Sequence, residues 1–90
     1  MSVYIISYDL KKPGQDYAAL YEELKKTTWW HYLESTWLLN TPESIDNLRK
    51  RLFAMMDQND SLFIIELSAK NNYTGWLPQK AWDWIKQNLA

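Results

Sequence analysis

The order of hydrophobic patterns along the chain predicts a small α+β sandwich of the ferredoxin-like type with one helix added at its C-terminal end. Residues 3–8 and 61–68 are rich in β-branched and aromatic residues without a helical period, which is typical of strands. Two amphipathic segments and a β-rich stretch, 27–40, lie between them. The resulting order, β-α-β-β-α-β, is the split β-α-β plan, in which both helices cover one face of an antiparallel sheet.

The first half of the chain is expected to form a strand, a helix and a strand pair. The strand over residues 3–8 is apolar on both of its alternating faces, which indicates a central position covered on both sides. Asp16 is expected to cap a helix that ends at the lysines of residues 25–26, where cations favour the helix dipole. Residues 27–40 are long for one strand, so we expect two strands with a bend near residues 34–35.

The second helix is expected to begin at Thr41, with the threonine as the N-cap and Pro42 at the first helical position. Its apolar residues recur at the spacing of one helix face. That stripe is expected to be buried and consists of Ile45, Leu48, Leu52 and either Met55 or Met56.

The last strand and the last helix raise the question of what covers the far side of the sheet. The strand over residues 61–68 is apolar on both faces until Glu66. The final helix is expected over residues 78–89, with Trp82 rather than Trp84 on its buried side. Because the two amphipathic helices cover only one face, the second face needs either this helix or a second copy of the chain as its cover.

The composition is compatible with either way of covering the second face of the sheet, by the final helix or by a second copy of the chain. Ninety residues predict a single domain, residues 1–90, with a core over 3–68 and a C-terminal extension over 69–90. Hydrophobic residues make up 47% and there are six tryptophans, more than a monomer this small easily hides. We therefore expect a homodimer.

The chain contains no cysteine, which excludes disulfides and thiolate metal sites. It has no apolar run near the ~18 residues that a membrane span needs, and its first residues lack the basic region of a signal peptide. These features predict a cytoplasmic protein with no membrane partner. The net charge of −1 argues against a surface coated in positive charge for nucleic acid, although a local basic patch is compatible with it.

Asp9 is the main candidate site residue because it closes the first strand just before Lys11 and Lys12. Such a carboxylate could hold Mg²⁺, which typically takes one or two protein carboxylates and keeps several waters. The alternative is an ordinary turn residue, since aspartate is common where strands become loops. Glu66 is expected either to approach Asp9 within the sheet or to lie at an exposed strand end.

His31 is the only histidine and a candidate general base, but a lone histidine beside Trp29 and Trp30 is more often a half-buried packing residue. The aromatic residues could stack on nucleic-acid bases, although packing is the commoner use. Several basic side chains could form a basic rim or simply face solvent: Lys11, Lys12, Lys25, Lys26, Arg49, Lys50 and Arg51.

Three short motifs carry a family resemblance: residues 8–10 (Tyr-Asp-Leu) end the first strand, 35–37 (Ser-Thr-Trp) open the third, and 59–62 (Asn-Asp-Ser-Leu) enter the fourth. Over residues 3–68 the chain resembles CRISPR-associated protein two, the small adaptation subunit of CRISPR antiviral defence. It also resembles VapD-type toxins of toxin-antitoxin systems and stand-alone relatives labelled SinR-like.

This resemblance implies a ferredoxin-like fold and a homodimer packed sheet to sheet. It also implies a Mg²⁺-dependent endonuclease site, for RNA or DNA, at Asp9 paired across the two-fold axis, with Lys11 and Lys12 as candidate nucleic-acid contacts. Some members of the family serve as structural DNA-binding scaffolds. The alternative to a nuclease is therefore a non-catalytic dimeric module that binds a protein or nucleic-acid partner.

Overall fold

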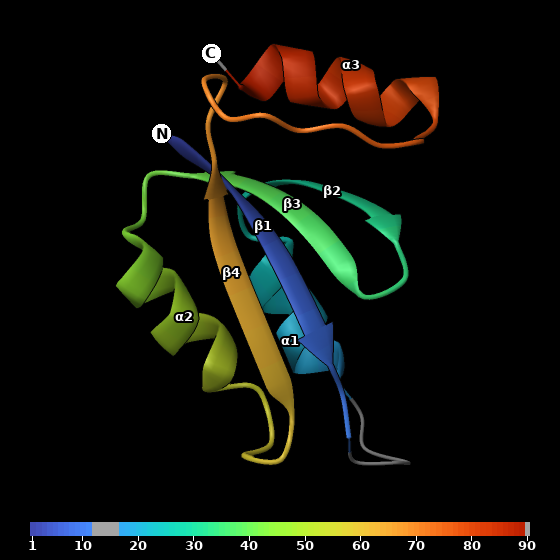
Figure 1. The fold of residues 1–90 in the computed structure, drawn as a ribbon. Helices are drawn as coiled ribbons and strands as arrows, with labels where there is room; N and C mark the ends of the chain where they lie inside the picture. Colours follow the sequence, from blue (N-terminus) through green and yellow to red (C-terminus); the bar gives the residue numbers. More distant parts are fainter. Residues whose placement is uncertain (12–16, 90) are drawn as a thin grey trace.

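The computed structural model describes residues 1–11 and 17–89, which form one four-stranded sheet and three helices (Figure 1). The sheet order is β2-β3-β1-β4 with every neighbouring pair antiparallel, so the predicted ferredoxin-like α+β fold is confirmed. No helix in the described ranges is long and apolar enough to cross a bilayer. The elements in chain order are β1 (Ser2–Asp9), α1 (Ala18–Leu24), β2 (Thr28–Leu33), β3 (Thr36–Thr41), α2 (Ile45–Phe53), β4 (Ser61–Leu67) and α3 (Gln79–Asn88).

The strand β1 lies in the middle of the sheet, as its two apolar faces predict. Ile6 in β1 stands opposite Trp37 in β3 and Ile64 in β4. The expected bend near residues 34–35 is the turn that joins β2 to β3. The strands β2 and β4 are therefore the two edges of the sheet.

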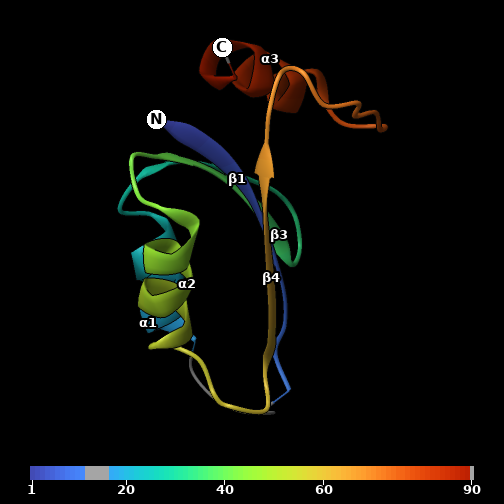
Figure 2. The ribbon, with the colours of Figure 1, turned by 60° about the vertical axis from the view of Figure 1, so that its left-hand side comes forward.

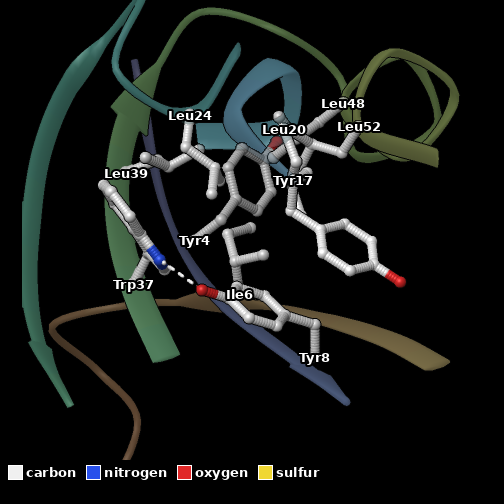
Figure 3. Packing of buried hydrophobic residues seen from close by; sticks show 10 residues of the cluster. All are labelled: Tyr4, Ile6, Tyr8, Tyr17, Leu20, Leu24, Trp37, Leu39, Leu48 and Leu52. Carbon is white, nitrogen blue, oxygen red and sulfur yellow. Dashed lines mark hydrogen bonds between the residues drawn. The ribbon is translucent and has the colours of Figure 1, made fainter. Parts of the chain in front are cut away.

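The helices α1 and α2 lie together on one face of the sheet (Figure 2). Each contributes two fully buried leucines, Leu20 and Leu24 from α1 and Leu48 and Leu52 from α2. They close over a cluster whose remaining members come mostly from alternate residues of β1 and β3 (Figure 3). Those members are Tyr4, Ile6, Tyr8, Tyr17, Trp37 and Leu39.

One hydrogen bond joins two aromatic side chains of this cluster, Trp37 and Tyr8. The Trp37 Nε1–H donates to the Tyr8 hydroxyl at 3.0 Å, so both polar atoms keep a partner despite their burial (Figure 3). Burial is also the main reason why the pKa of Tyr8 is raised. The phenol therefore stays neutral and structural.

The second face of the sheet is covered at one end only. There α3 packs Ile85 against Val3, Leu38 and Leu67, while Figure 2 shows the helix lying across the end of the sheet near the N-terminus of β1. Both Trp82 and Trp84 are half-buried and both contact this cluster, so the structure does not single out Trp82 as the buried ring. Asp16, the expected cap of α1, lies outside the described residues.

The predicted start of the second helix was wrong. Thr41 is the last residue of β3, paired with Ser2 in the ladder and fully buried, and Ser44 is the N-cap. The Ser44 hydroxyl accepts from the backbone N–H of Asn47 at 3.2 Å. The strand ladder holds Thr41, so the helix has to begin one turn later, at the next residue able to cap it.

The late start also explains why the predicted stripe is only partly buried. Leu48 and Leu52 are fully buried, but Ile45 now lies in the first turn and is 40% exposed. The helix ends at Phe53, before either methionine, and Met56 packs partly against the cluster while Met55 is exposed.

Candidate functional site

Asp9 ends β1 on the second face of the sheet, at the end opposite α3. Its side chain is 63% exposed. It lines a shallow hollow of about 210 Å³ together with Ser7 from β1 and Ser61, Leu62 and Phe63 from β4. Asp9 stands opposite Ser61 in the ladder, so the hollow sits where the two strands begin to separate.

Lys11 pairs with Asp9 at 2.6 Å between its Nζ and the Asp9 Oδ2. The hydrogen bond to Asp9 is the main reason why the pKa of Lys11 is raised. Both side chains are more than half exposed, so the pair contributes little to stability. Its consequence is local: the Lys11 ammonium group neutralises the Asp9 carboxylate. Lys12, the other predicted nucleic-acid contact, lies outside the described residues.

A buried carboxylate, Asp60, fixes the backbone that follows Asp9. It accepts hydrogen bonds from the Lys11 N–H at 2.7 Å, from the Tyr17 hydroxyl at 2.9 Å and from the Asp57 N–H at 2.8 Å. The end of β1, the start of α1 and the turn before β4 are therefore tied together. The sequence showed Asp60 only as part of the motif at residues 59–62, because its partners at Lys11 and Tyr17 are more than 40 residues away along the chain.

The side chains around Asp9 offer the oxygen ligands that a hard cation prefers, but they include too few carboxylates for a complete site. Ser7 and Ser61 line the same hollow and add hydroxyl oxygens to the carboxylate, and oxygen ligands are those that Mg²⁺ prefers. Within the described ranges no group of three or more acidic, histidine or cysteine side chains could hold a metal ion. A single chain thus offers Mg²⁺ one carboxylate, and a second copy of Asp9 would complete the usual pair.

Glu66 does not approach Asp9. It stands opposite Tyr4, five residues before Asp9 along β1, which corresponds to a separation of about 16 Å. Tyr4 belongs to the face that carries α1 and α2, whereas Asp9 lies on the second face. The other alternative holds: Glu66 is exposed near the end of β4, because antiparallel pairing brings the start of β4, not its end, to the end of β1.

The part of the second face around Asp9 is uncovered and carries large apolar side chains on its two edge strands, with hydroxyl side chains between them. The ladder places one row of residues across all four strands, from Leu33 through Thr36 and Ser7 to Phe63. Phe63 is 66% exposed and Leu33 is 49% exposed, and Ile65, two residues along β4 from Phe63, is 47% exposed. We call this surface, together with Asp9, the open face.

His31 lies on the other side of the sheet and packs on Trp37. The two rings are parallel within 9° at 3.9 Å, and the His31 Nε2 is 3.0 Å from the Glu34 carbonyl oxygen. The predicted packing role is therefore observed, with the difference that the side chain is exposed rather than half-buried. A separate hollow surrounds this stack between α1 and β2.

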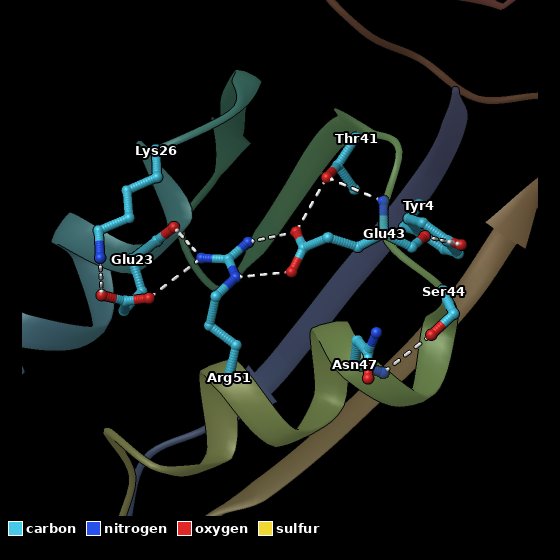
Figure 4. A network of polar contacts seen from close by, with 8 residues as sticks. All are labelled: Tyr4, Glu23, Lys26, Thr41, Glu43, Ser44, Asn47 and Arg51. Atoms are coloured by element: carbon cyan, nitrogen blue, oxygen red, sulfur yellow. Dashed lines mark hydrogen bonds and ion pairs between the residues drawn. The ribbon is translucent and has the colours of Figure 1, made fainter.

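Among the basic side chains, Arg51 is structural rather than part of a solvated rim. Its guanidinium donates to both Glu43 carboxylate oxygens, at 2.7 and 2.8 Å, and to the Glu23 carbonyl oxygen at 2.6 Å (Figure 4). The hydrogen bond from Arg51 is the main cause of a lowered pKa at Glu43, and that from Lys26 is the main cause at Glu23. Arg51 thus joins α2 to the end of α1.

No protein-family model matches the chain, and no curated protein matches it. Among solved structures, the chain is similar to the crystal structure of a hypothetical protein, TT1823, from Thermus thermophilus. The TM-score is 0.63 at 22% sequence identity, and the match covers 86% of this chain and 94% of the other. This similarity concerns the fold, which both chains share over most of their length.

Proposed function

We propose that the chain functions as a homodimer assembled through the open face, and that the paired Asp9 carboxylates form a Mg²⁺-dependent nuclease site. The observation that carries this proposal is the position of Asp9 at the margin of the open face. Two copies related by a two-fold axis would bring the same apolar patch and the same carboxylate together, as isologous interfaces do.

The open face has the character of an interface. Phe63, Ile65 and Leu33 expose large apolar side chains on one side of the sheet, while α3 covers the other end of that side. Adjacent exposed apolar side chains, such as Phe63 and Ile65 along β4, are a feature of interaction surfaces. A stable dimer buries on the order of 1,200 Å² or more in total, which a sheet-to-sheet contact supplies readily.

Pairing the two Asp9 side chains would place two negative charges close together, and a cation between them would relieve the repulsion. Like charges brought close together cannot both stay ionised without cost, so the pair would retain a proton or bind a metal ion. A bound Mg²⁺ supplies Lewis acidity and a more acidic water. In the proposed hydrolysis, a water oxygen forms a bond to the phosphodiester phosphorus, the bond to the leaving sugar oxygen breaks, and that oxygen takes up a proton.

Lys11 has a second role in this proposal. It neutralises Asp9 while the metal is absent and, on its flexible stem, is able to move to a substrate phosphate once Mg²⁺ takes its place. The resemblance of residues 3–68 to CRISPR-associated protein two and VapD-type toxins supports a nucleic-acid substrate. It also supports a place in the cytoplasm, in antiviral defence or a toxin-antitoxin system.

The test is cleavage of single-stranded RNA and duplex DNA by the purified protein, with Mg²⁺ or Mn²⁺ and with chelator. We expect cleavage that needs the metal and is abolished by Asp9→Asn while the dimer persists. Lys11→Met should lower the Mg²⁺ concentration needed for half-maximal cleavage, because it removes the competing ammonium. Equal activity in the wild type and Asp9→Asn would show that the cleavage comes from a contaminant.

A second candidate function is a non-catalytic binding module. One observation favours it: the extended segment between β4 and α3 carries Trp76, whose side chain is 100% exposed, and Tyr73, which is 46% exposed. Exposed aromatic side chains are typical anchors of protein interfaces. In this case the protein should show no cleavage with any metal, and Asp9→Asn should leave partner binding unchanged.

A further inference from the structure

A second concave surface lies on the helix side of the sheet, between α1 and the edge strand β2. It is a hollow of about 330 Å³ lined by Tyr21 from α1, Lys25 directly after α1, Trp29 and His31 from β2 and Trp37 from β3. We call it the aromatic hollow. It shares no residue with the open face, and the sheet separates it from Asp9.

The rings of the aromatic hollow form an open stack. Trp37 is the buried floor, His31 lies parallel to it at 3.9 Å, and Trp29 leans on it at 5.2 Å with a tilt of 50°. Tyr21 stacks on the same indole at 6.2 Å. Trp29 is 39% exposed and His31 is also exposed, so the stack presents ring surface to solvent at the sheet edge. A planar ring entering the hollow could extend it.

The hollow also carries a positive charge without a fixed acidic partner. The Lys25 Nζ lies over the Trp29 ring, 5.6 Å from its centroid, and forms no ion pair with any residue that the structure describes. The nearby Glu23 carboxylate is occupied by Lys26 and Arg51. A ring stacked on Trp29 would therefore bring an attached anionic group within reach of the Lys25 ammonium.

A nucleotide combines a planar aromatic ring with an adjacent negative charge and so matches both features of the hollow. We propose that the aromatic hollow binds a single unpaired nucleotide, with its base stacked on Trp29 and its phosphate beside Lys25. Base stacking on aromatic side chains needs the face of the base to be free, which excludes the interior of a duplex. The nucleotide is either a free mononucleotide or one residue of a single strand.

This proposal does not depend on the Asp9 site, and its test is designed to stay separate from cleavage. Binding is measured with chelator present, in Asp9→Asn protein, using adenosine monophosphate in one arm and fluorescently labelled ten-nucleotide single strands in the other. Calorimetry follows the first arm and fluorescence anisotropy the second. We expect Trp29→Ala to weaken binding by about 5- to 150-fold, the range for losing one stacked base.

The matched control is Phe53→Ala, which removes an aromatic ring of similar exposure, 40% against 39% for Trp29, from α2 outside the hollow and should leave binding unchanged. Trp29→Phe, which keeps a ring, should restore most of the affinity. Lys25→Met should weaken binding and reduce the salt dependence by about one phosphate contact, whereas Lys80→Met on α3 should not. Lys25 is exposed, so this variant remains informative if Trp29→Ala is poorly folded.

Binding of the mononucleotide that depends on Trp29 and Lys25 would support a small-nucleotide ligand, and binding of the strand alone would support a site for single-stranded nucleic acid. The proposal is overturned if neither probe binds at millimolar concentration. It is also overturned if binding is the same in the wild type, Trp29→Ala and Lys25→Met. A negative result here would leave metal-dependent cleavage at Asp9 unaffected, since that is read out with different variants and a different assay.

Discussion

The two faces of the sheet differ in how completely the chain covers them. On the helix face, α1 and α2 bury Leu20, Leu24, Leu48 and Leu52 to 1% exposure or less. On the second face, α3 covers one end and leaves Phe63 66% exposed beside Asp9. The first face carries the larger buried cluster, and the second face has a smaller one with α3 and keeps large apolar side chains exposed beside Asp9. This contrast predicts that equivalent apolar substitutions have different effects on the two faces.

The largest expected effect is on the helix face. Leu48→Ala removes a fully buried side chain from α2 and leaves a cavity, so we expect a loss of about 2–5 kcal/mol in the free energy of unfolding. Urea denaturation followed by circular dichroism measures it. A loss below about 1 kcal/mol would mean that Leu48 of α2 is not packed in the core as the structure shows.

The next effect concerns the network that joins α2 to α1. Glu43→Gln removes the charge that Arg51 grips with two hydrogen bonds, so we expect a loss of about 1–3 kcal/mol at pH 7. Because the folded-state pKa of Glu43 is lowered from its ordinary 4.5, the wild type gains this stability above pH 4.5 and loses it as the pH falls below that value. The difference between wild type and variant should therefore shrink below pH 4.5, and a difference that is constant from pH 7 to 3 would contradict the charge-based explanation.

Substitutions on the open face are expected to change the free energy of unfolding least. They are expected to change the oligomeric state most. Phe63→Glu replaces a mostly exposed ring, so the monomer should lose no more than about 0.5 kcal/mol. The proposed dimer should dissociate, because the variant places a like charge in each copy of one symmetric interface. Light scattering coupled to size exclusion at tens of micromolar gives the mass directly. Wild-type protein that is already monomeric in that measurement would remove the basis for the dimer.

Much of the fold was predictable from local patterns, because each strand and helix shows its own period in the sequence. The order of elements, the central position of β1 and the turn near residues 34–35 follow from those periods. The start of α2 did not, since Thr41 is a good cap by local preference but is held in the ladder by Ser2. Both Thr41 and Ser44 could cap a helix by local preference, and the strand pairing of Thr41 left Ser44 as the cap.

The candidate site was predictable only in part. Asp9 was found because it closes a strand next to a lysine, and Lys11 pairs with it as that proximity suggests. The role of Asp60 depends on partners distant in sequence, and the choice between the two alternatives for Glu66 depends on the direction of pairing. The aromatic hollow was missed as a unit because its residues come from three elements, although Trp29, His31 and Lys25 were each noticed.

The most direct test of the proposed assembly uses the absence of cysteine from the chain. A single Asp9→Cys variant, treated with a short bis-maleimide reagent at micromolar concentration, should yield a covalent dimer of twice the 10.8 kDa chain mass. The same variant combined with Phe63→Glu should yield none, and neither should Lys80→Cys on α3. Rapid cross-linking through Asp9→Cys that Phe63→Glu abolishes is the result predicted here. Failure of Asp9→Cys to cross-link, or equal cross-linking through Lys80→Cys, would contradict a dimer that pairs the two Asp9 side chains across the open face.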